Sequence, residues 1–149
     1  MDPICTAALG KFREQEQGFL AVVAGLPDDA LNWRPGAETN SIAVLVAHTW
    51  GAAQAWTARA GGGEIERDRA AEFRVVLSAT ECDALVQRAG ASIASFVAAI
   101  DPTTYGDDRV DPNDEHYTVA MCLIHALEHT QEHLAHASLT RQLWEQRGP

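Results

Sequence analysis

The segment from Thr118 to about Gln146 contains neither glycine nor proline, and it constrains the fold more than any other part of the chain. Thr118 can cap a helix through its side-chain oxygen, and no helix breaker follows it within the segment. At 1.5 Å per residue, such a helix is about 42 Å long. We therefore expect it either to extend beyond its neighbours or to support a site along its length.

Three further segments have apolar residues at three- and four-residue steps, the spacing of one helix face. They run from about Ile4 to Ala24, from about Ser41 to Ala60, and from the Ser-x-x-Glu capping box at 78–81 to Ile100. A triple glycine at 61–63 ends the second helix, and the charged stretch 64–72 is predicted to be a long connection. The chain is thus predicted to be all-α, a four-helix bundle without strands that forms one domain over residues 1–149.

The chain is acidic, because 11 Lys and Arg against 21 Asp and Glu give a formal net charge of -10. Nucleic-acid binding begins with attraction to phosphate, so this charge disfavours DNA and RNA as partners. The acidity is densest at five positions: Asp107, Asp108, Asp111, Asp114 and Glu115. A cation site is one interpretation of this cluster, and a solvated loop is the one that we favour.

Cysteine use and the N-terminus both bear on the compartment. Cys5, Cys82 and Cys122 are odd in number and far apart, so they predict neither a disulfide framework nor a zinc knuckle, and they suit a reducing cytoplasm. The N-terminus lacks a basic region followed by an apolar run, and no stretch approaches the length of apolar sequence that spans a bilayer. We expect a cytoplasmic protein that is neither secreted nor inserted in a membrane.

Four of the six histidines lie within twelve residues of the predicted final helix: His125, His129, His133 and His136. Residues four apart are offset by about 40° around a helix and about 6 Å along it. His129 and His133 therefore point toward one place and can share a metal ion. For His125 and His136, four roles stay open: a fourth ligand, a hydrogen-bond donor behind a ligand, a general base, or an ordinary surface residue.

A third ligand is predicted on the second helix. His48 lies at helical spacing on a stripe that should face the bundle interior, among Val44, Leu45, Ala52, Ala55 and Trp56. A lone histidine there is better interpreted as a core residue that bonds a backbone carbonyl. The paired histidines of the final helix make a shared metal the better account, because facing helices of bundles often hold metals. Three imidazoles leave one position open, which is typical of catalytic zinc sites.

Short motifs spread over nearly the whole chain resemble a known family. In order, they are Leu26-Pro27 with Leu31-Asn32-Trp33-Arg34-Pro35, Asn40-Ser41-Ile42 before His48, Arg67-Asp68-Arg69 with Glu72-Phe73, and Glu128-His129 with Glu132-His133-Leu134, Leu139 and Arg141. Each motif is weak alone, whereas their order and spacing are specific. On these motifs the chain resembles the DinB/YfiT-like proteins, a family of four-helix-bundle metalloenzymes.

This resemblance implies a metal site and a chemistry. The family's three metal histidines correspond to His48, His129 and His133, and imidazole ligands favour zinc or nickel as the divalent ion. Characterised relatives include thiol S-transferases and a thiol-dependent isomerase, which use low-molecular-weight thiols such as bacillithiol, mycothiol or glutathione. Many members have Gly-Gln after the last ligand where this chain has Ala135-His136, so the pocket beside the metal does not carry over.

We therefore predict a metal-dependent, transferase-like enzyme in which the ion lowers the pKa of a thiol or water and presents it to a small electrophilic substrate. Glu132 is the candidate catalytic general base. Two alternatives to this function stay open: a non-enzymatic metal-containing binding or stress-response module, and a metal-water hydrolase. For the assembly, a homodimer stays open.

A peptidase is a further alternative, which ranks low. The segment from His129 to His133 matches His-x-x-Glu-His, the inverzincin pattern in which a glutamate activates water for peptide hydrolysis. That class takes a third ligand, usually acidic, from well downstream. The only later acidic residue here is Glu145, which is predicted to lie in the same helix.

Overall fold

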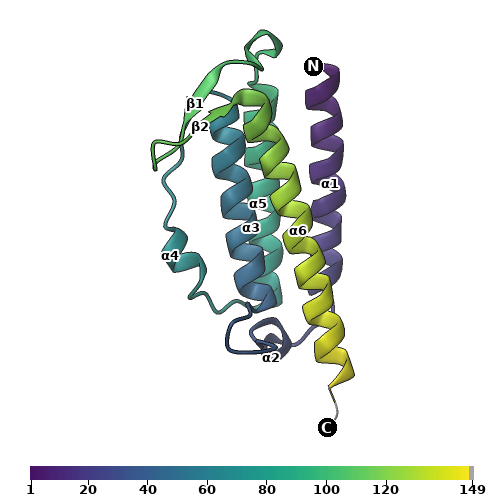
Figure 1. Ribbon diagram of the computed structural model, residues 1–149. Helices are drawn as coiled ribbons and strands as arrows, with labels where there is room; N and C mark the ends of the chain where they lie inside the picture. Colours follow the sequence, from purple (N-terminus) through teal and green to yellow (C-terminus); the bar gives the residue numbers. More distant parts are fainter. Residues whose placement is uncertain (148–149) are drawn as a thin grey trace.

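The computed structural model describes residues 1–147, and within them four long helices form a bundle (Figure 1). These are α1 (Pro3–Val23), α3 (Ile42–Ala60), α5 (Ala79–Ala98) and α6 (Val119–Gln146). α5 and α6 each pack against both α1 and α3, so α1 and α3 lie diagonally opposite each other. The predicted all-α bundle is confirmed, and the observed ends of the long helices lie within two residues of the predicted ones.

Each long helix begins at a side chain that accepts a hydrogen bond from an otherwise unpaired backbone N–H. Asp2 accepts from the amide of Ile4 at 2.8 Å, and Ser41 accepts from that of Val44 at 3.2 Å. At α5, Ser78 and Glu81 form the predicted capping box. Thr118 caps α6, as predicted, by accepting from the amide of Met121 at 3.1 Å. These local bonds explain why the helix starts were readable from the sequence.

Buried apolar side chains from all four long helices form the core. Its centre includes Trp50, whose ring meets that of Phe19 edge to face with centroids 5.8 Å apart. Burying one large apolar side chain contributes about 1.5–3 kcal/mol, so this core is a main source of the stability of the bundle. All three cysteines are buried and free. No helix within residues 1–147 is both long and apolar enough to cross a membrane.

The prediction that the chain has no strands is wrong. β1 (Asp108–Val110) and β2 (His116–Thr118) pair antiparallel, with Val110 opposite His116. Between them, the Asp111 carboxylate accepts the amides of Asn113 and Glu115 at 2.8 and 3.0 Å and so reverses the chain. Strands of three largely polar residues carry no alternating apolar pattern, so they could not be recognised from the sequence. His116, expected in an acidic loop, is in β2, where its Nδ1 lies 2.6 Å from Asp108.

Two short helices were also not predicted, α2 (Asp28–Leu31) and α4 (Arg69–Glu72). Each has four residues, too few to show a helical period. A 3-10 turn at Pro102–Thr104 precedes the hairpin. The α4 turn lies within the segment that the sequence predicts to be a connection. This segment also supplies side chains that pack against α3.

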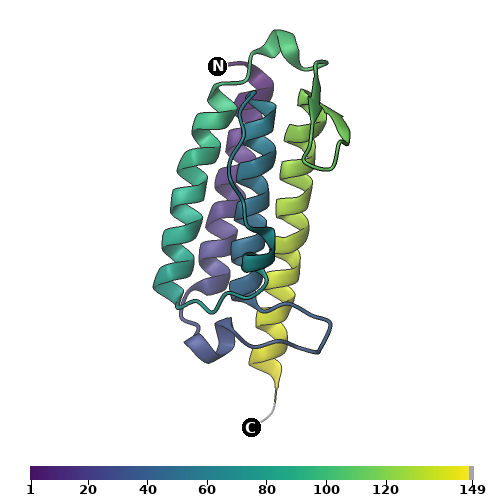
Figure 2. The same cartoon turned by 90° about the vertical axis from the view of Figure 1, so that its left-hand side faces the viewer.

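The direction of the helices determines where this connection runs. α3 and α5 are parallel to each other, so residues 61–78 return along the length of the bundle on the outer side of α3 (Figure 2). Asn32 holds the far end of the connection with two hydrogen bonds, from its Nδ2 to the Leu77 carbonyl at 2.9 Å and from the Leu77 amide to its Oδ1 at 3.1 Å. The connection therefore brings polar side chains from 67–72 against α3.

Candidate metal centre

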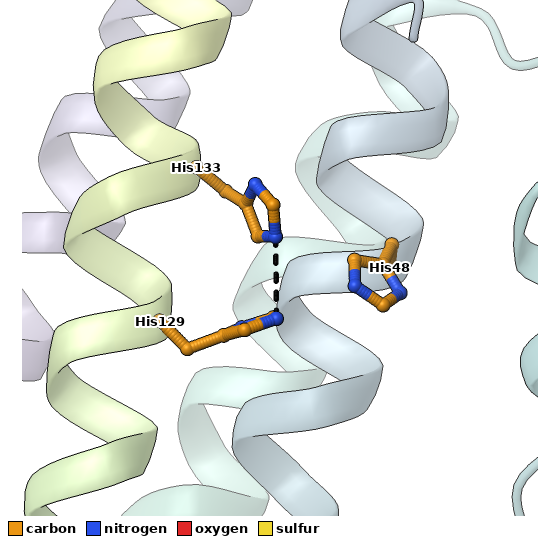
Figure 3. Close-up of side chains that lie close together, drawn as sticks. All are labelled: His48, His129 and His133. Carbon is orange, nitrogen blue, oxygen red and sulfur yellow. Dashed lines mark hydrogen bonds between the residues drawn. The ribbon is translucent and has the colours of Figure 1, made fainter.

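Three imidazole rings converge where α3 packs against α6 (Figure 3). His129 and His133 project from α6 with their Nε2 atoms 3.2 Å apart, and the ring of His48 faces them from α3. The His48 ring centroid lies 5.1 Å from that of His129 and 5.2 Å from that of His133. One nitrogen of each ring lies within 4.8 Å of the other two, so the group can hold a metal ion.

The environment keeps the two α6 histidines neutral. Burial, together with the neighbouring His133 and His48, lowers the pKa of His129 to about 3. Burial also lowers the pKa of His133, with His48 and His136 acting in the same direction and Glu132 opposing them. A neutral imidazole has a free lone pair and is the form that binds a metal, so the site is prepared for an ion without a prior loss of protons.

His48 is held from behind by a carboxylate. It is 7% exposed, and its Nδ1 lies 3.1 Å from Oε2 of Glu72, which is brought there by α4. Burial raises the pKa of Glu72, but the hydrogen bonds from His48 and Arg67 outweigh it and hold that pKa below its usual value. An ionised carboxylate only accepts, so Nδ1 is the donor to Glu72, and in the neutral ring this leaves the lone pair on Nε2 for a metal.

Arg67 fixes Glu72 in turn. Its Nε and Nη2 donate to the two carboxylate oxygens of Glu72, each at 2.7 Å, in a fork that sets the orientation of the carboxylate. Gly51, on α3, makes the approach possible, because a Cβ at that position would overlap the Glu72 carboxylate. The chain from Arg67 through Glu72 to His48 therefore orients one ring of the group. Arg67 and Glu72 belong to one of the family motifs in the sequence, but no role was predicted for them or for Gly51.

The remaining histidines of α6 lie beside the group. Nδ1 of His133 is 3.2 Å from Nδ1 of the exposed His136, so His136 contacts this candidate ligand on the side away from the other two rings. His125 packs against the ring of Trp56, with centroids 4.5 Å apart, and its centroid lies 5.8 Å from that of His129. Nδ1 of His129 is buried without a hydrogen-bond partner among residues 1–147, so packing holds that ring. Neither His125 nor His136 joins the three-histidine group.

The donor set fits a divalent transition metal. Zinc–nitrogen bonds are about 2.0–2.1 Å long, which places two nitrogens of a tetrahedral site about 3.3 Å apart. The 3.2 Å between the two Nε2 atoms on α6 matches this spacing. Within residues 1–147 no fourth His, Cys, Asp or Glu joins the group, so the protein would leave a coordination position open.

A cavity of about 580 Å³ lies beside the group, and both His48 and His129 form part of its wall. α3 and the connection after it supply most of the other lining residues, and residues 111–113 at the tip of the β hairpin also line the cavity. Ala52, Ala55, Trp56 and Ile65 make part of the wall apolar. A small molecule in this cavity would therefore touch two of the three candidate ligands.

Sequence comparison decides the family. The sequence model of the DinB superfamily matches residues 11–137, most of the chain. The chain belongs to the DinB superfamily. A search of curated proteins finds no match. Among solved structures, a conserved protein from Enterococcus faecalis is similar in fold, with a TM-score of 0.78 over 96% of this chain and 98% of that one, at 14% sequence identity.

The two acidic residues considered for catalysis in this DinB superfamily chain, Glu132 as general base and Glu145 as a peptidase ligand, both lie outside the three-histidine group. Glu132 is exposed on α6 and adjoins His133 in the sequence, and it is not part of the three-histidine group. Glu145, the acidic residue that a peptidase arrangement would need, lies at the end of α6 and pairs with Arg141 at 2.8 Å. In the structure His48, and not a downstream acid, completes the group of three.

Proposed function

We propose that this DinB superfamily protein is a metal-dependent enzyme that activates a low-molecular-weight thiol, or water, for attack on a small electrophilic substrate. His48, His129 and His133 are the proposed ligands, and zinc or nickel is the proposed ion. The observation that carries the proposal is the group of three imidazoles, two of which line a cavity, without a fourth protein donor in residues 1–147. A structural zinc site would normally have four protein ligands.

The residues around the three histidines have separate roles in the proposed reaction. A divalent ion held there would favour the deprotonated form of a thiol or water and so supply a nucleophile at neutral pH. Glu72 keeps His48 in the tautomer that presents Nε2, and Arg67 holds Glu72. Glu132 is our candidate for the base that accepts the nucleophile's proton, because it is solvent-accessible and close enough for its charge to act on His133. The apolar wall of the cavity would hold the electrophile and limit its contact with water.

Cobalt substitution tests the thiol step directly. Cobalt-loaded protein should develop a sulfur-to-metal charge-transfer band when glutathione, bacillithiol or mycothiol is added, because a metal favours the thiolate. A variant with Cys5, Cys82 and Cys122 changed to Ser removes the chain's own thiols as a source of the band. The same thiol should accelerate conjugation of a reactive test electrophile. If all three thiols leave the spectrum and the rate unchanged, thiol transfer is excluded.

A panel of activated esters and amides then separates the two alternatives, a metal-water hydrolase and a non-enzymatic module. Glu132→Gln should abolish a hydrolytic activity that uses this carboxylate as general base while leaving the metal content unchanged. Glu128→Gln is the matched control, because Glu128 is also exposed on α6, one helical turn away. Full activity in Glu132→Gln would remove the catalytic role of Glu132, and no activity toward the whole panel would favour the module.

A further inference from the structure

Positive charge gathers around the cavity beside the candidate metal centre. The chain has a net charge of -10, yet three arginines line this cavity: Arg59, Arg67 and Arg69. Asp111 is the one acidic residue among the lining residues. A bound divalent ion would add further positive charge at the histidine wall. The cavity therefore differs in sign from the molecule as a whole.

Two of the three arginines make no direct ion pair in the part of the chain that the structure describes. Arg67 is neutralised by Glu72, whereas Arg59 and Arg69 form no ion pair within residues 1–147. The Arg59 guanidinium lies over the ring of Trp56, 4.7 Å from its centroid, and that of Arg69 lies 5.0 Å from the centroid of Phe73. Stacking on a ring holds the plane of a guanidinium and leaves its N–H edge free for an anion.

Arg59 is the more constrained of the two. Its Nε is buried and has no hydrogen-bond partner in the described part of the chain. Leaving a buried charged donor unpaired costs more than leaving a neutral one, so a carboxylate that reaches the Arg59 guanidinium from the cavity would offset part of this cost. Asp111 is close enough to interact with Arg59 through its charge, but its carboxylate accepts hydrogen bonds from Asn113 and Glu115 within the hairpin turn and makes no direct ion pair with the guanidinium.

We propose that this cavity binds a carboxylate on the substrate or on the thiol, with Arg59 as its main contact and Arg69 as a second one. The carbon chain of the ligand lies along Trp56, and its reacting end lies at His48 and His129, which share the cavity. The reacting-end assignment rests on the proposed metal-dependent function, whereas the carboxylate contact stands on the arginines. A carboxylate matches the flat edge of a guanidinium, which can donate two parallel hydrogen bonds to it.

The test compares two thiols of equal length that differ in charge, 3-mercaptopropionate and 3-mercaptopropionamide. Calorimetry on zinc-loaded protein should show about tenfold tighter binding of the acid, as expected for a charge-assisted hydrogen bond. Arg59→Gln should reduce this preference to less than about twofold. The control is Arg88→Gln, which removes the same charge from an exposed position on α5 and should keep the preference. An unchanged preference in Arg59→Gln would show that the metal ion, and not Arg59, binds the carboxylate, and it would overturn the proposal.

A second measurement works without the metal. The Arg59 Nε–H is buried, so its nitrogen resonance should be visible in a ¹⁵N spectrum, and Arg59→Gln identifies it. The resonance should shift on addition of the acid and stay in place on addition of the amide, in both zinc-loaded and metal-free protein. If neither thiol binds the zinc while the resonance shifts, the thiol function fails and the carboxylate site stands. A resonance that the acid does not move overturns the site.

Discussion

Gly51 lies three residues after His48 in the middle of α3, where a glycine costs the helix about 1 kcal/mol relative to alanine. The structure gives a reason for it. Glu72 reaches His48 across the backbone of Gly51, and a side chain there would push the carboxylate away and crowd Arg67. The missing side chain thus exchanges helix stability for the hydrogen bond that orients a proposed ligand.

Gly51→Ala should separate these two effects. We expect zinc affinity, measured by competition with a chromophoric chelator, to fall about 10- to 100-fold, as loss of a ligand's hydrogen-bonded partner does elsewhere. Glu72→Gln should reproduce the loss with the glycine in place. Gly10→Ala is the control, because Gly10 is also inside a helix but a Cβ there meets nothing within 4 Å. Unchanged affinity in Gly51→Ala would mean that Glu72 does not support the metal site.

The histidines and their supporting residues were not equally predictable. His129 and His133 follow from spacing on a single helix, and His48 from its place on an apolar stripe. Glu72 and Arg67 lie in a segment with no apolar period, and their distance from His48 depends on the path of a connection in space. A glycine inside a helical pattern was the available signal, because it often marks a close approach.

Arg141 links the last long helix, α6, to the first, α1. From α6, its Nη1 lies 2.9 Å from the carbonyl oxygens of Ala21, Val22 and Ala24, at the C-terminal end of α1. These carbonyls have no partners within α1, and a positive charge there also complements the helix dipole. Arg141 therefore acts as a cap for α1 supplied by another helix.

We expect Arg141→Gln to lower the free energy of unfolding by about 1.5–3 kcal/mol, the range for hydrogen bonds to a charged group. Urea denaturation followed by circular dichroism measures the change. Arg13→Gln removes the same charge from an exposed position on α1 and should change stability by less than about 0.5 kcal/mol. Equal stability of the two variants would contradict the capping role.

At this scale the sequence predicted the long helices better than the pieces between them. Caps at Ser41, Ser78 and Thr118 are local, so the sequence alone locates them. The hairpin depends on an aspartate turn and on backbone pairing between short polar strands, neither of which leaves a periodic pattern. The path of residues 61–78 follows from α3 and α5 being parallel, a property of the whole bundle that no local motif encodes.

The proposed metal would tie together parts of the molecule that are distant in sequence. His48 comes from α3 and the other two proposed ligands from α6. The connection that carries Glu72 packs against α3, where Glu72 contacts His48. An ion that binds only the folded chain stabilises it by mass action, by about 2.7 kcal/mol at a free concentration 100 times the dissociation constant. Metal binding and global stability are therefore linked through the packing of α3 on α6.

This linkage predicts that zinc raises the melting temperature of metal-free protein by roughly 5–10 °C, since 1 kcal/mol shifts a domain of this size by about 2–4 °C. Differential scanning calorimetry at fixed excess zinc gives the shift. It should vanish in His48→Ala, which leaves two ligands on one helix and no bridge between helices. His116→Ala should keep the shift, because His116 lies in the hairpin and pairs with Asp108. If His48→Ala responded to zinc as fully as the unmodified chain, the ion would be held by α6 alone, and His48 would be a core residue hydrogen-bonded to Glu72.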